Sequence, residues 1–375
     1  MSKELDKIWL SSPHMGGNEK KYVLDAIESN WVSPLGPYVV KMESELAKYI
    51  KCNDVALLNS GTAAIHLALK LLEVAQGDIV LCQSMTFSAS ANPILYEKAI
   101  PVFIDSEEET WNICPLAAEV AIKKYISLNK KPKAIIVVHL YGMPAKMAEL
   151  TKLSNKYEIP IIEDAAEALG SNINNKMCGS FSEFGILSFN GNKIITTSGG
   201  GALLSNNVLA IQKARFLASQ AKDPAPHYEH SAIGYNYRLS NISAAIGVGQ
   251  LEVLNNRVLA RRANFDFYKD NLSSIEGIKF NMEPEGFYSN RWLSCITLDS
   301  NKFSPDQLRL GLEKQNIESR PLWKPMHLQP IFREFDFIGG SVSENLFNNG
   351  LCLPSGSNLN NIDRERVLKT IKSLL

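Results

Sequence analysis

Short apolar runs of three to five residues recur between positions 55 and 204, and stretches with helical spacing separate them. Such runs are typical of strands buried on both faces, and their alternation with helices indicates a mostly parallel sheet. The pattern predicts an α/β fold with helices on both faces of a seven-stranded sheet. The expected strands are Val55–Leu58, Ile79–Cys82, Pro101–Ile104, Ala134–Val138, Pro160–Ile162, Gly185–Phe189 and Gly201–Leu204. In such sheets the ligand crevice lies beyond the carboxyl ends of the strands.

The segments around this pattern are more helical, and they suggest two domains. We expect a large domain over residues 1–250 and a smaller C-terminal α+β domain over residues 251–375. A strand is expected near Trp292–Leu298, and the longest loop at residues 219–238, where a functional role is usual. The predicted helices include Asn18–Ser29, Tyr38–Ile50, one opening at Ser84–Phe87, Lys146–Lys156, one long helix over Asn241–Phe267, Pro305–Gln315 and a last one from Asp363.

Composition narrows the class of protein. The 375 residues include 39 Lys and Arg and 39 Asp and Glu, so the net charge is zero, which argues against a nucleic-acid binder. The six cysteines are scattered without a CxxC pair and predict reduced thiols in a cytoplasmic protein. No run approaches the ~20 apolar residues of a membrane span, and no signal peptide is recognisable. The scattered histidines predict no metal site.

One lysine lies in an uncharged stretch between positions 188 and 201. Lys193 follows the apolar run that ends at Phe189 and precedes three consecutive glycines. Burying a lone ammonium is costly, which favours the neutral amine that Schiff-base chemistry needs. A solvated lysine on a turn is the commoner arrangement. The residues at the other strand ends are therefore needed to distinguish a solvated Lys193 from a reactive one.

Four features at predicted strand ends supply complementary chemistry. Ser60–Thr62 opens a helix, whose N-terminus suits a phosphate, although a plain N-cap is commoner. Phe87 offers a face for a flat ring, with core packing as the alternative. Asp164 could hold a pyridine nitrogen protonated or cap a helix. Ser188 stands five residues before Lys193, next to small residues that let a ligand approach. Together these features predict pyridoxal 5′-phosphate as the cofactor, and no dinucleotide or P-loop fingerprint competes with them.

Six motifs carry a family resemblance over nearly the whole chain. They are Asn59–His66, Pro101–Asp105, His139–Gly142, Glu163–Glu167, Ser188–Lys193 and Gly234–Leu239. Together they resemble the DegT/StrS sugar-nucleotide aminotransferases, which are fold-type-I pyridoxal-phosphate enzymes with an aspartate aminotransferase-like fold.

The resemblance implies roles for individual residues. It implies Lys193 as the Schiff-base lysine and Asp164 as the partner of the pyridine nitrogen. Asn236 matches an asparagine that reaches the cofactor phosphate of the other subunit, which implies a homodimer with shared active sites. Many members carry glutamine or histidine where this chain has Glu167, so the role of that residue stays open. The remaining implied cofactor contacts are Gly61, Thr62 and Ser188 at the phosphate, Phe87 on the ring and Glu167 near its phenolic oxygen.

A closer resemblance concerns the sugar. The segments Pro13–Asn18, His227–His230, Ser289–Trp292 and Arg320–His327 look like the branch of the family that makes bacillosamine precursors. That branch implies transfer of an amino group from L-glutamate to C4 of a UDP-linked 4-keto-6-deoxy-N-acetylglucosamine. Tryptophans could supply ring faces for this pocket, or simply pack in the core or an interface, and Arg320 and Lys324 could supply charge for a diphosphate. The tryptophans are Trp31, Trp292 and Trp323, and the expected sugar contacts are Asn30, Trp31, Val32, Ser33, Ser60, Arg238, Arg320, Trp323, Lys324, Met326 and His327.

Three alternatives stay open. A sugar dehydratase of the same fold usually carries histidine in place of the lysine, so Lys193 argues against it. Another 4-keto sugar, either altrose-configured or linked to dTDP or GDP, would use the same chemistry. A regulatory protein that binds pyridoxal phosphate without catalysis comes from a different class, and the intact catalytic positions argue against it.

Overall fold

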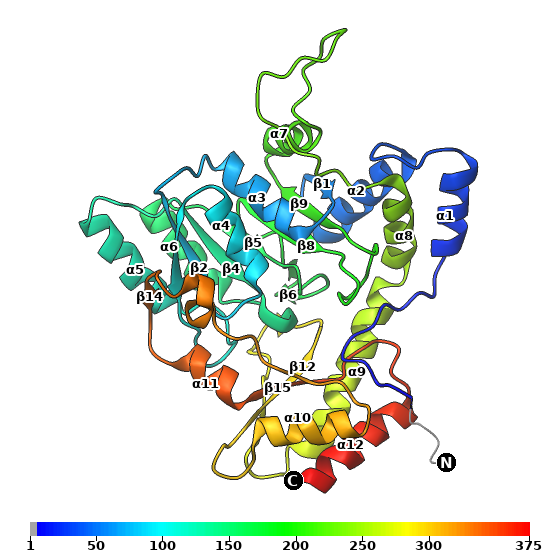
Figure 1. Cartoon of the computed structure of the whole chain (residues 1–375), viewed down its shortest axis with the longest axis vertical. Coiled ribbons are helices and arrows are strands. Elements are labelled where there is room, and N and C mark those ends of the chain that lie inside the picture. The colour runs from blue at the N-terminus through cyan, green and yellow to red at the C-terminus, as the bar shows by residue number, and fades with distance from the viewer. Residues whose placement is uncertain (1–5) are drawn as a thin grey trace.

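The structure, a computed structural model, describes residues 6–375. A large sheet with helices on both faces forms the main body, and a smaller sheet lies at the end of the molecule where the C-terminus is found (Figure 1). Both predicted features of the main body, a mostly parallel sheet and helices on its two faces, are confirmed.

The large sheet has eight strands, one more than the predicted seven. The extra strand, β14, comes from the C-terminal part of the chain and pairs with the edge strand β3. All neighbouring pairs are parallel except those of β9, which runs antiparallel to both β1 and β8. The order across the sheet is β1 (Asp54–Leu58), β9 (Gly201–Ser205), β8 (Phe184–Ser188), β5 (Ile161–Asp164), β4 (Ala134–Val138), β2 (Ile79–Gln83), β3 (Ile100–Ile104) and β14 (Phe337–Ile338).

This strand order brings the predicted chemistry to one edge of the sheet. Because β9 is antiparallel to both neighbours, β1 and β8 point the same way as β5. The carboxyl ends of β1, β8 and β5 therefore lie beside the amino end of β9, where the glycines precede Gly201. Register pairs Gly201 with both Leu58 and Ser188, so the segments that follow β1 and β8 meet the glycine segment directly.

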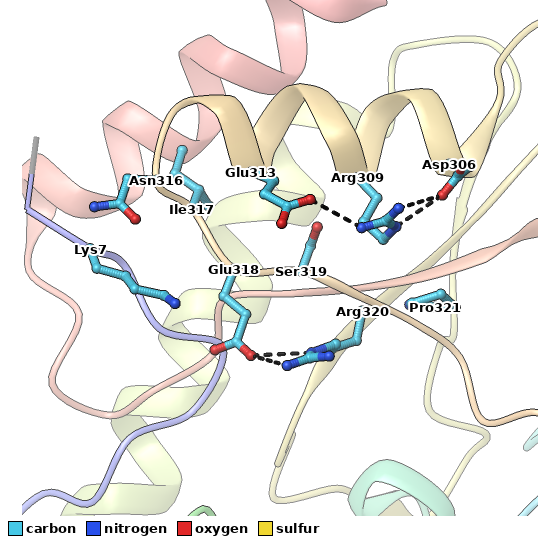
Figure 2. Close-up of a pocket in the computed structure, with 10 residues that line it drawn as sticks. All are labelled: Lys7, Asp306, Arg309, Glu313, Asn316, Ile317, Glu318, Ser319, Arg320 and Pro321. Atoms are coloured by element: carbon cyan, nitrogen blue, oxygen red, sulfur yellow. Dashed lines mark hydrogen bonds and ion pairs between the residues drawn. The ribbon is translucent and has the colours of Figure 1, made fainter.

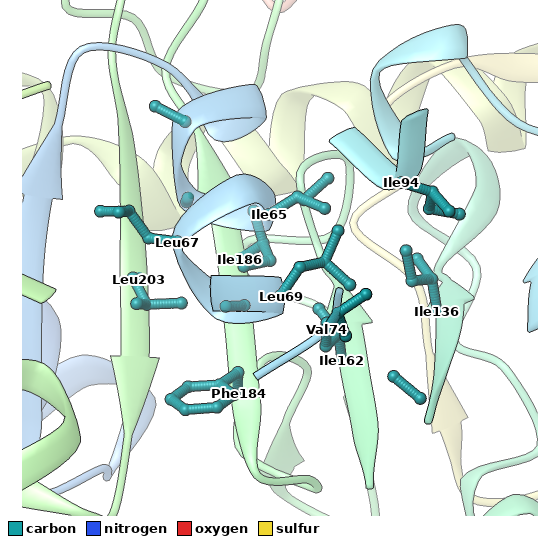
Figure 3. Packing of buried hydrophobic residues seen from close by; sticks show 14 of the residues in the cluster. Ile65, Leu67, Leu69, Val74, Ile94, Ile136, Ile162, Phe184, Ile186 and Leu203 are labelled. Atoms are coloured by element: carbon teal, nitrogen blue, oxygen red, sulfur yellow. The ribbon is translucent and has the colours of Figure 1, made fainter. Parts of the chain in front are cut away.

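Alternate residues of each central strand face opposite layers of helices, which explains the unbroken apolar runs. Ile136 of β4 packs in the cluster with α3, as Figure 3 shows. Its neighbour Ile135 packs on the other face, with α5 and α6. A third cluster joins α2 and α8 to the β1 end of the sheet. The helices of this body are α1 (Glu19–Glu28), α2 (Pro37–Ile50), α3 (Gly61–Leu71), α4 (Asn92–Tyr96), α5 (Pro115–Ser127), α6 (Met147–Tyr157), α7 (Val208–Ala218) and α8 (Asn241–Glu252).

The smaller sheet is antiparallel and has its own core. Tyr268 and Leu272 of helix α9 pack in one cluster with Ile296 of the sheet and Leu312 and Ile371 of two covering helices. Its strands, in spatial order, are β10 (Ile278–Phe280), β12 (Ser294–Leu298), β15 (Gly350–Leu353) and β13 (Arg320–Pro321). The helices are α9 (Leu254–Leu272), α10 (Pro305–Lys314), α11 (Val342–Asn349) and α12 (Asn361–Leu374), and a third small sheet joins β11 (Phe287–Tyr288), β6 (Asn172–Ile173) and β7 (Lys176–Met177). The division of the chain near residue 250 stays a prediction.

Two helix predictions were wrong in detail. The single helix over Asn241–Phe267 is two helices, because Val253 leaves helical geometry at φ −110° and ψ 5°. The two helices serve different cores: Val248 of α8 packs under the large sheet, and Tyr268 of α9 packs under the smaller one. No helix opens at Ser84–Phe87, where bends lead instead to a 3-10 turn, η1 (Ser88–Ser90). The remaining 3-10 turns are η2 (Leu140–Gly142), η3 (Met326–Leu328) and η4 (Pro330–Phe332).

The long loop at residues 219–238 follows α7 and projects away from the body (Figure 1). Tyr228 and Ile233 of this loop are exposed. Within residues 6–375, none of the helices combines the length and the apolar character that crossing a membrane requires.

Candidate active site

A cavity of about 270 Å³ opens at the sheet edge where the strand ends meet. It collects the segments after β1, β2, β5 and β8 together with two tryptophans from the region of the smaller sheet. Its lining is Asn59, Ser60, Gly61, Thr62, Ile65, Thr86, Phe87, Ala89, Ser90, Val138, Asp164, Ala166, Glu167, Ser188, Asn190, Asn192, Lys193, Gly199, Gly200, Trp292 and Trp323. Most of the predicted cofactor contacts therefore share one cavity.

One wall of the cavity is suited to an anion. Ser60 is the N-cap of α3, and its hydroxyl accepts a hydrogen bond from Ala63 N at 3.0 Å. The N–H groups of Gly61 and Thr62 belong to the first turn of that helix, where the dipole favours negative charge. The glycine at 201 permits this arrangement, because a Cβ there would lie 2.4 Å from the nitrogen of Gly61. Capping and anion binding, offered as alternatives by the sequence, are compatible here.

Asp164 ends β5 with its carboxylate facing the cavity. The side chain is buried, its Oδ2 accepts a hydrogen bond from the Ser90 hydroxyl at 2.6 Å, and its Oδ1 accepts one from Ala166 N at 3.1 Å. Thr86 in turn lies 2.7 Å from Ser90, Oγ1 to Oγ. A turn rather than a helix follows Asp164, so the helix-cap alternative does not apply.

Lys193 reaches the cavity from the segment between β8 and β9. Its Nζ lies 3.5 Å from Oε1 of Glu167 and 4.1 Å from the ring centroid of Trp292. The Trp292 indole is fixed because its Nε1–H donates to the carbonyl of Asn192 at 2.7 Å. The sequence left open whether Lys193 is a solvated lysine or a reactive one. In the structure it is a mostly buried side chain with an acidic partner.

Glu167 is held from its other side by Tyr141. The backbone N–H of Tyr141 donates to Oε2 of Glu167 at 2.7 Å. Burial raises the pKa of Glu167, and the nearby Asp164 raises it further, while Lys193 and the Tyr141 N–H act in the opposite direction. The carboxyl group therefore keeps a proton to a higher pH than an exposed glutamate does.

The aromatic rings of Phe87, Trp292 and Trp323 line part of the cavity, and the buried Tyr141 packs against both indoles. Phe87 is 54% exposed, and its ring centroid lies 5.5 Å from that of Trp323. The Tyr141 ring lies nearly parallel to both indoles, at 6.1 Å from Trp323 and 6.4 Å from Trp292. Phe87 is thus free of the core packing that was its alternative, and its face is available to a flat ring.

Several of the expected sugar contacts lie outside this cavity. Trp31 is half exposed in the loop between α1 and α2, where its carbonyl accepts a hydrogen bond from Asn241 Nδ2 at 2.7 Å. Met326 is buried in the core, and His327 bonds Ser84 Oγ through Nδ1 at 2.7 Å. Asn30, Val32 and Ser33, in the same loop as Trp31, also lie outside the cavity lining. So do Arg238, Arg320 and Lys324.

The two predicted arginines have partners of their own. Arg238 pairs with Glu43 at 3.2 Å, and burial lowers its pKa. Arg320 lies in a separate groove of about 500 Å³ and pairs with Glu318 at 2.9 Å, as Figure 2 shows. Asn236 is exposed at the base of the long loop, outside the cavity of its own chain.

Sequence reasoning missed the residues that support the reactive groups. Ser90 and Thr86 support Asp164, and the only sequence signal for them is a run of small hydroxyl residues after a strand. Tyr141 lies in a motif that was noted, but its contact with Glu167 depends on a left-handed backbone conformation, φ 54°, which no pattern of residues reveals. Among residues 6–375, no cluster of three or more His, Cys, Asp or Glu side chains is arranged to hold a metal.

Comparison with known proteins assigns the chain to a family. EpsN from Bacillus subtilis (strain 168), named as a candidate pyridoxal phosphate-dependent aminotransferase, is 54% identical over 372 residues, which cover 98% of this chain and 96% of EpsN. GDP-perosamine synthase from Vibrio cholerae is 34% identical over 363 residues, which cover 96% of this chain and 97% of that enzyme.

Solved structures agree with this assignment. Spr1654 from Streptococcus pneumoniae, a candidate sugar aminotransferase in its PLP form, superposes with a TM-score of 0.90 at 25% identity and covers 98% of both chains. The sequence profile of the DegT/DnrJ/EryC1/StrS aminotransferase family matches residues 13–372. The chain therefore belongs to the DegT/DnrJ/EryC1/StrS aminotransferase family.

Proposed function

We propose that this protein is a pyridoxal phosphate-dependent aminotransferase that moves an amino group from L-glutamate to C4 of a UDP-linked 4-keto-6-deoxy-N-acetylhexosamine. The observation that carries the chemical class is the meeting of Lys193 and Asp164 in one cavity beneath the N-terminus of α3. Pyridoxal 5′-phosphate is the cofactor, as in the PLP form of Spr1654.

The donor set of the cavity fits this cofactor. The N-terminal N–H groups of α3 and the hydroxyls of Thr62 and Ser188 suit its phosphate. The buried carboxylate of Asp164 lines the same cavity and suits a protonated ring nitrogen. The exposed face of Phe87 also borders the cavity and suits the ring itself.

When bound, the cofactor supplies an aldehyde that can carry an amino group and a ring that withdraws electrons. Asp164 keeps the ring nitrogen protonated, and Ser90 and Ala166 N fix the carboxylate for that purpose. Lys193 supplies the amine that meets the aldehyde and then moves protons at the reacting carbons through Nζ. Trp292 and Trp323 exclude water from one side of the cavity.

Two observations bear on which nucleotide sugar is used. The bacillosamine branch is supported by the segments that resemble it, and the two indoles on the cavity wall suit a sugar ring. A GDP-linked 4-keto-6-deoxy sugar is the second candidate, because GDP-perosamine synthase is 34% identical to this chain over almost its whole length.

The active form is a homodimer with shared sites. Asn236 is exposed and does not line the cavity of its own chain, which supports a role in the site of a second copy. The test mixes Lys193→Ala and Asn236→Ala subunits, which are each expected to be poorly active. A mixed dimer contains one intact site, so activity should return on mixing; no recovery after confirmed subunit exchange would contradict sharing.

The substrate test uses the purified protein with L-glutamate that carries an isotope-labelled amino nitrogen. UDP-, dTDP- and GDP-linked 4-keto-6-deoxy sugars are offered in parallel, and the products are analysed by mass spectrometry. We expect the label in the UDP-linked N-acetylhexosamine first. Label only in a GDP-linked product would select the second candidate, and no label in any product with the cofactor bound would remove the aminotransferase assignment itself.

A further inference from the structure

The amine of Lys193 lies between two groups that attract a cation. Oε1 of Glu167 is 3.5 Å from Nζ, and the face of Trp292 is 4.1 Å from it on another side. Only 13% of the lysine side chain and 5% of the glutamate side chain are exposed. Both attractions are strongest for the ammonium form, and both weaken when the nitrogen loses its proton and its charge.

The carboxylate cannot easily turn away from the lysine, because Tyr141 fixes it. The Tyr141 N–H points at Oε2 from a backbone in the left-handed region, φ 54°, and Gly142 follows at φ 90°. A Cβ on Gly142 would lie 1.9 Å from Oδ1 of Asn290, so this turn has little freedom. The Tyr141 hydroxyl accepts a hydrogen bond from Trp323 N at 2.7 Å, which ties the turn to the opposite cavity wall.

The other charged groups near Lys193 leave this role to Glu167. Asp164 lies on the cavity floor and acts on Glu167, where it raises the pKa. The Arg261 guanidinium contacts the backbone of the segment, at 3.4 Å from the Lys193 carbonyl and 2.6 Å from the Trp292 carbonyl. Burial lowers the pKa of Arg261 to about 9. The thiol of Cys295, behind Tyr141, has a pKa that burial raises and is therefore neutral.

We propose that Glu167 is a positioning residue for Lys193: its carboxylate holds the ammonium against the indole of Trp292 and sets the pH at which the amine becomes neutral. Loss of the proton breaks one N–H bond, leaves the electron pair on nitrogen and passes the proton to water. The neutral amine is then held less strongly by both groups and can reach into the cavity. The inference rests on the proposed function only in taking Lys193 as the amine that meets the cofactor.

The test measures the reactivity of Lys193 in the cofactor-free protein, with no sugar or glutamate present. Trace acetic anhydride labels neutral amines, and the Lys193 peptide is quantified by mass spectrometry across a range of pH. The exposed Lys152 in the same sample serves as reference. In Glu167→Gln the half-maximal labelling of Lys193 should move down by at least about one pH unit, a tenfold change in proton concentration, because the counterion is gone.

Matched variants separate this role from a general effect of removing a buried acid. Glu163→Gln neutralises another buried glutamate four residues away that does not line the cavity, and it should leave the Lys193 midpoint unchanged. Glu167→Asp keeps the negative charge, so its Lys193 midpoint should stay close to that of the native chain. An unchanged midpoint in Glu167→Gln, or an equal shift in Glu163→Gln, overturns the proposal. If Glu167→Gln does not fold, Glu167→Asp decides. A Lys193 midpoint in Glu167→Asp that lies one pH unit or more below that of the native chain overturns the proposal, and a smaller shift supports it. Neither result depends on whether the enzyme turns over a nucleotide sugar.

Discussion

Two acid–base pairs near the ends of β4 and β5 show how differently the same residue type can be used. Glu163 pairs with His139 at 3.0 Å, and neither side chain is exposed. Their remaining atoms are also satisfied: His139 Nδ1 accepts from Ala145 N, and Glu163 Oε1 accepts from Phe181 N. Glu167, four residues further on, meets Lys193 at 3.5 Å in a cavity wall. The first pair is closed, and the second leaves a reactive atom open to a ligand.

The alternation of side chains along β5 accounts for the difference. Glu163 and its neighbour Asp164 project from opposite faces of the strand. Glu163 therefore faces the packed layer, whereas Asp164 faces the cavity and Glu167 returns to it after the turn. A fully bonded buried pair stabilises one conformation, but it has no free face for chemistry. A buried pair whose hydrogen bonds are only partly satisfied lowers the stability of the fold, but it places a titratable group in contact with a ligand in the cavity.

The largest expected effect is on the open pair. Lys193→Ala should lower turnover at least about a thousandfold, because no other amine in the cavity lining can replace Nζ. The apparent melting temperature should fall by only a few degrees, because the Glu167 carboxylate left without its partner can take up a proton. Amino-group transfer and a thermal scan are measured on the same preparation, with the exposed Lys152→Ala as control. Turnover near the native rate would mean that the open pair is not the reactive one.

A smaller loss is expected at Asp164. Asp164→Asn should still bind the cofactor but turn over about a hundredfold more slowly, because an amide cannot hold the ring nitrogen protonated. Cofactor absorbance and single-turnover rates separate the two effects. Ser90→Ala removes the 2.6 Å hydrogen bond to the carboxylate, together with the contact to Thr86 Oγ1, and should reduce the rate less. An equal loss in both variants would show that orientation, rather than charge, is what Asp164 provides.

The closed pair should respond in the opposite way. Glu163→Ala leaves His139 and Phe181 N without their buried acceptor, which should cost about 2–4 kcal/mol of stability. The apparent melting temperature should fall by several degrees, while turnover per folded molecule stays close to the native value. Thermal scans together with active-site titration measure the two quantities. A large loss of turnover per folded molecule would erase the distinction between the pairs.

The sequence predicted those parts of the site that strand ends bring together. Ser60–Thr62, Asp164, Ser188 and Lys193 all follow or precede strands whose order sends them to one edge, so their meeting follows from topology. The residues that support them depend on local backbone geometry. Tyr141 contacts Glu167 through a main-chain N–H in a left-handed turn, and the identity of the side chain gives no sign of it.

The expected sugar contacts in the segment Arg320–His327 stay a prediction, and the structure places them in different parts of the molecule. Neighbouring residues in an irregular segment point in different directions, so Trp323 lines the cavity while Met326 enters the core. Arg320 belongs to β13 and turns to Glu318 in another groove. The eighth strand, β14, escaped prediction for a related reason: two residues carry no periodicity, and only their pairing with β3 defines them.

A third buried pair gives the smallest expected effect and extends the comparison to pH. His66 lies in α3 one turn beyond its N-terminal residues, with Nε2 at 2.7 Å from Glu97 Oε1 and Nδ1 at 3.1 Å from the Tyr237 hydroxyl. With the Nε2–H donating to Glu97, Nδ1 accepts from Tyr237, so the ring is fully bonded in its neutral form. Burial lowers the pKa of His66 below its ordinary value near 6.5, against the opposing effect of Glu97.

The unfolded chain therefore takes up a proton at His66 at a higher pH than the folded chain does. The stability due to the neutral ring is present above pH 6.5 and is lost as the pH falls below it, by at most about 1.4 kcal/mol per pH unit. Urea unfolding of the cofactor-free protein at pH 7, 6 and 5.5 measures this loss. His66→Gln should lose about 1 kcal/mol less than the native chain over that range, whereas His227→Gln, in the exposed loop, should follow the native chain. If the native chain and both variants lose the same free energy of unfolding on acidification, the His66–Glu97 pair stabilises the protein through packing and not through the protonation state of the ring.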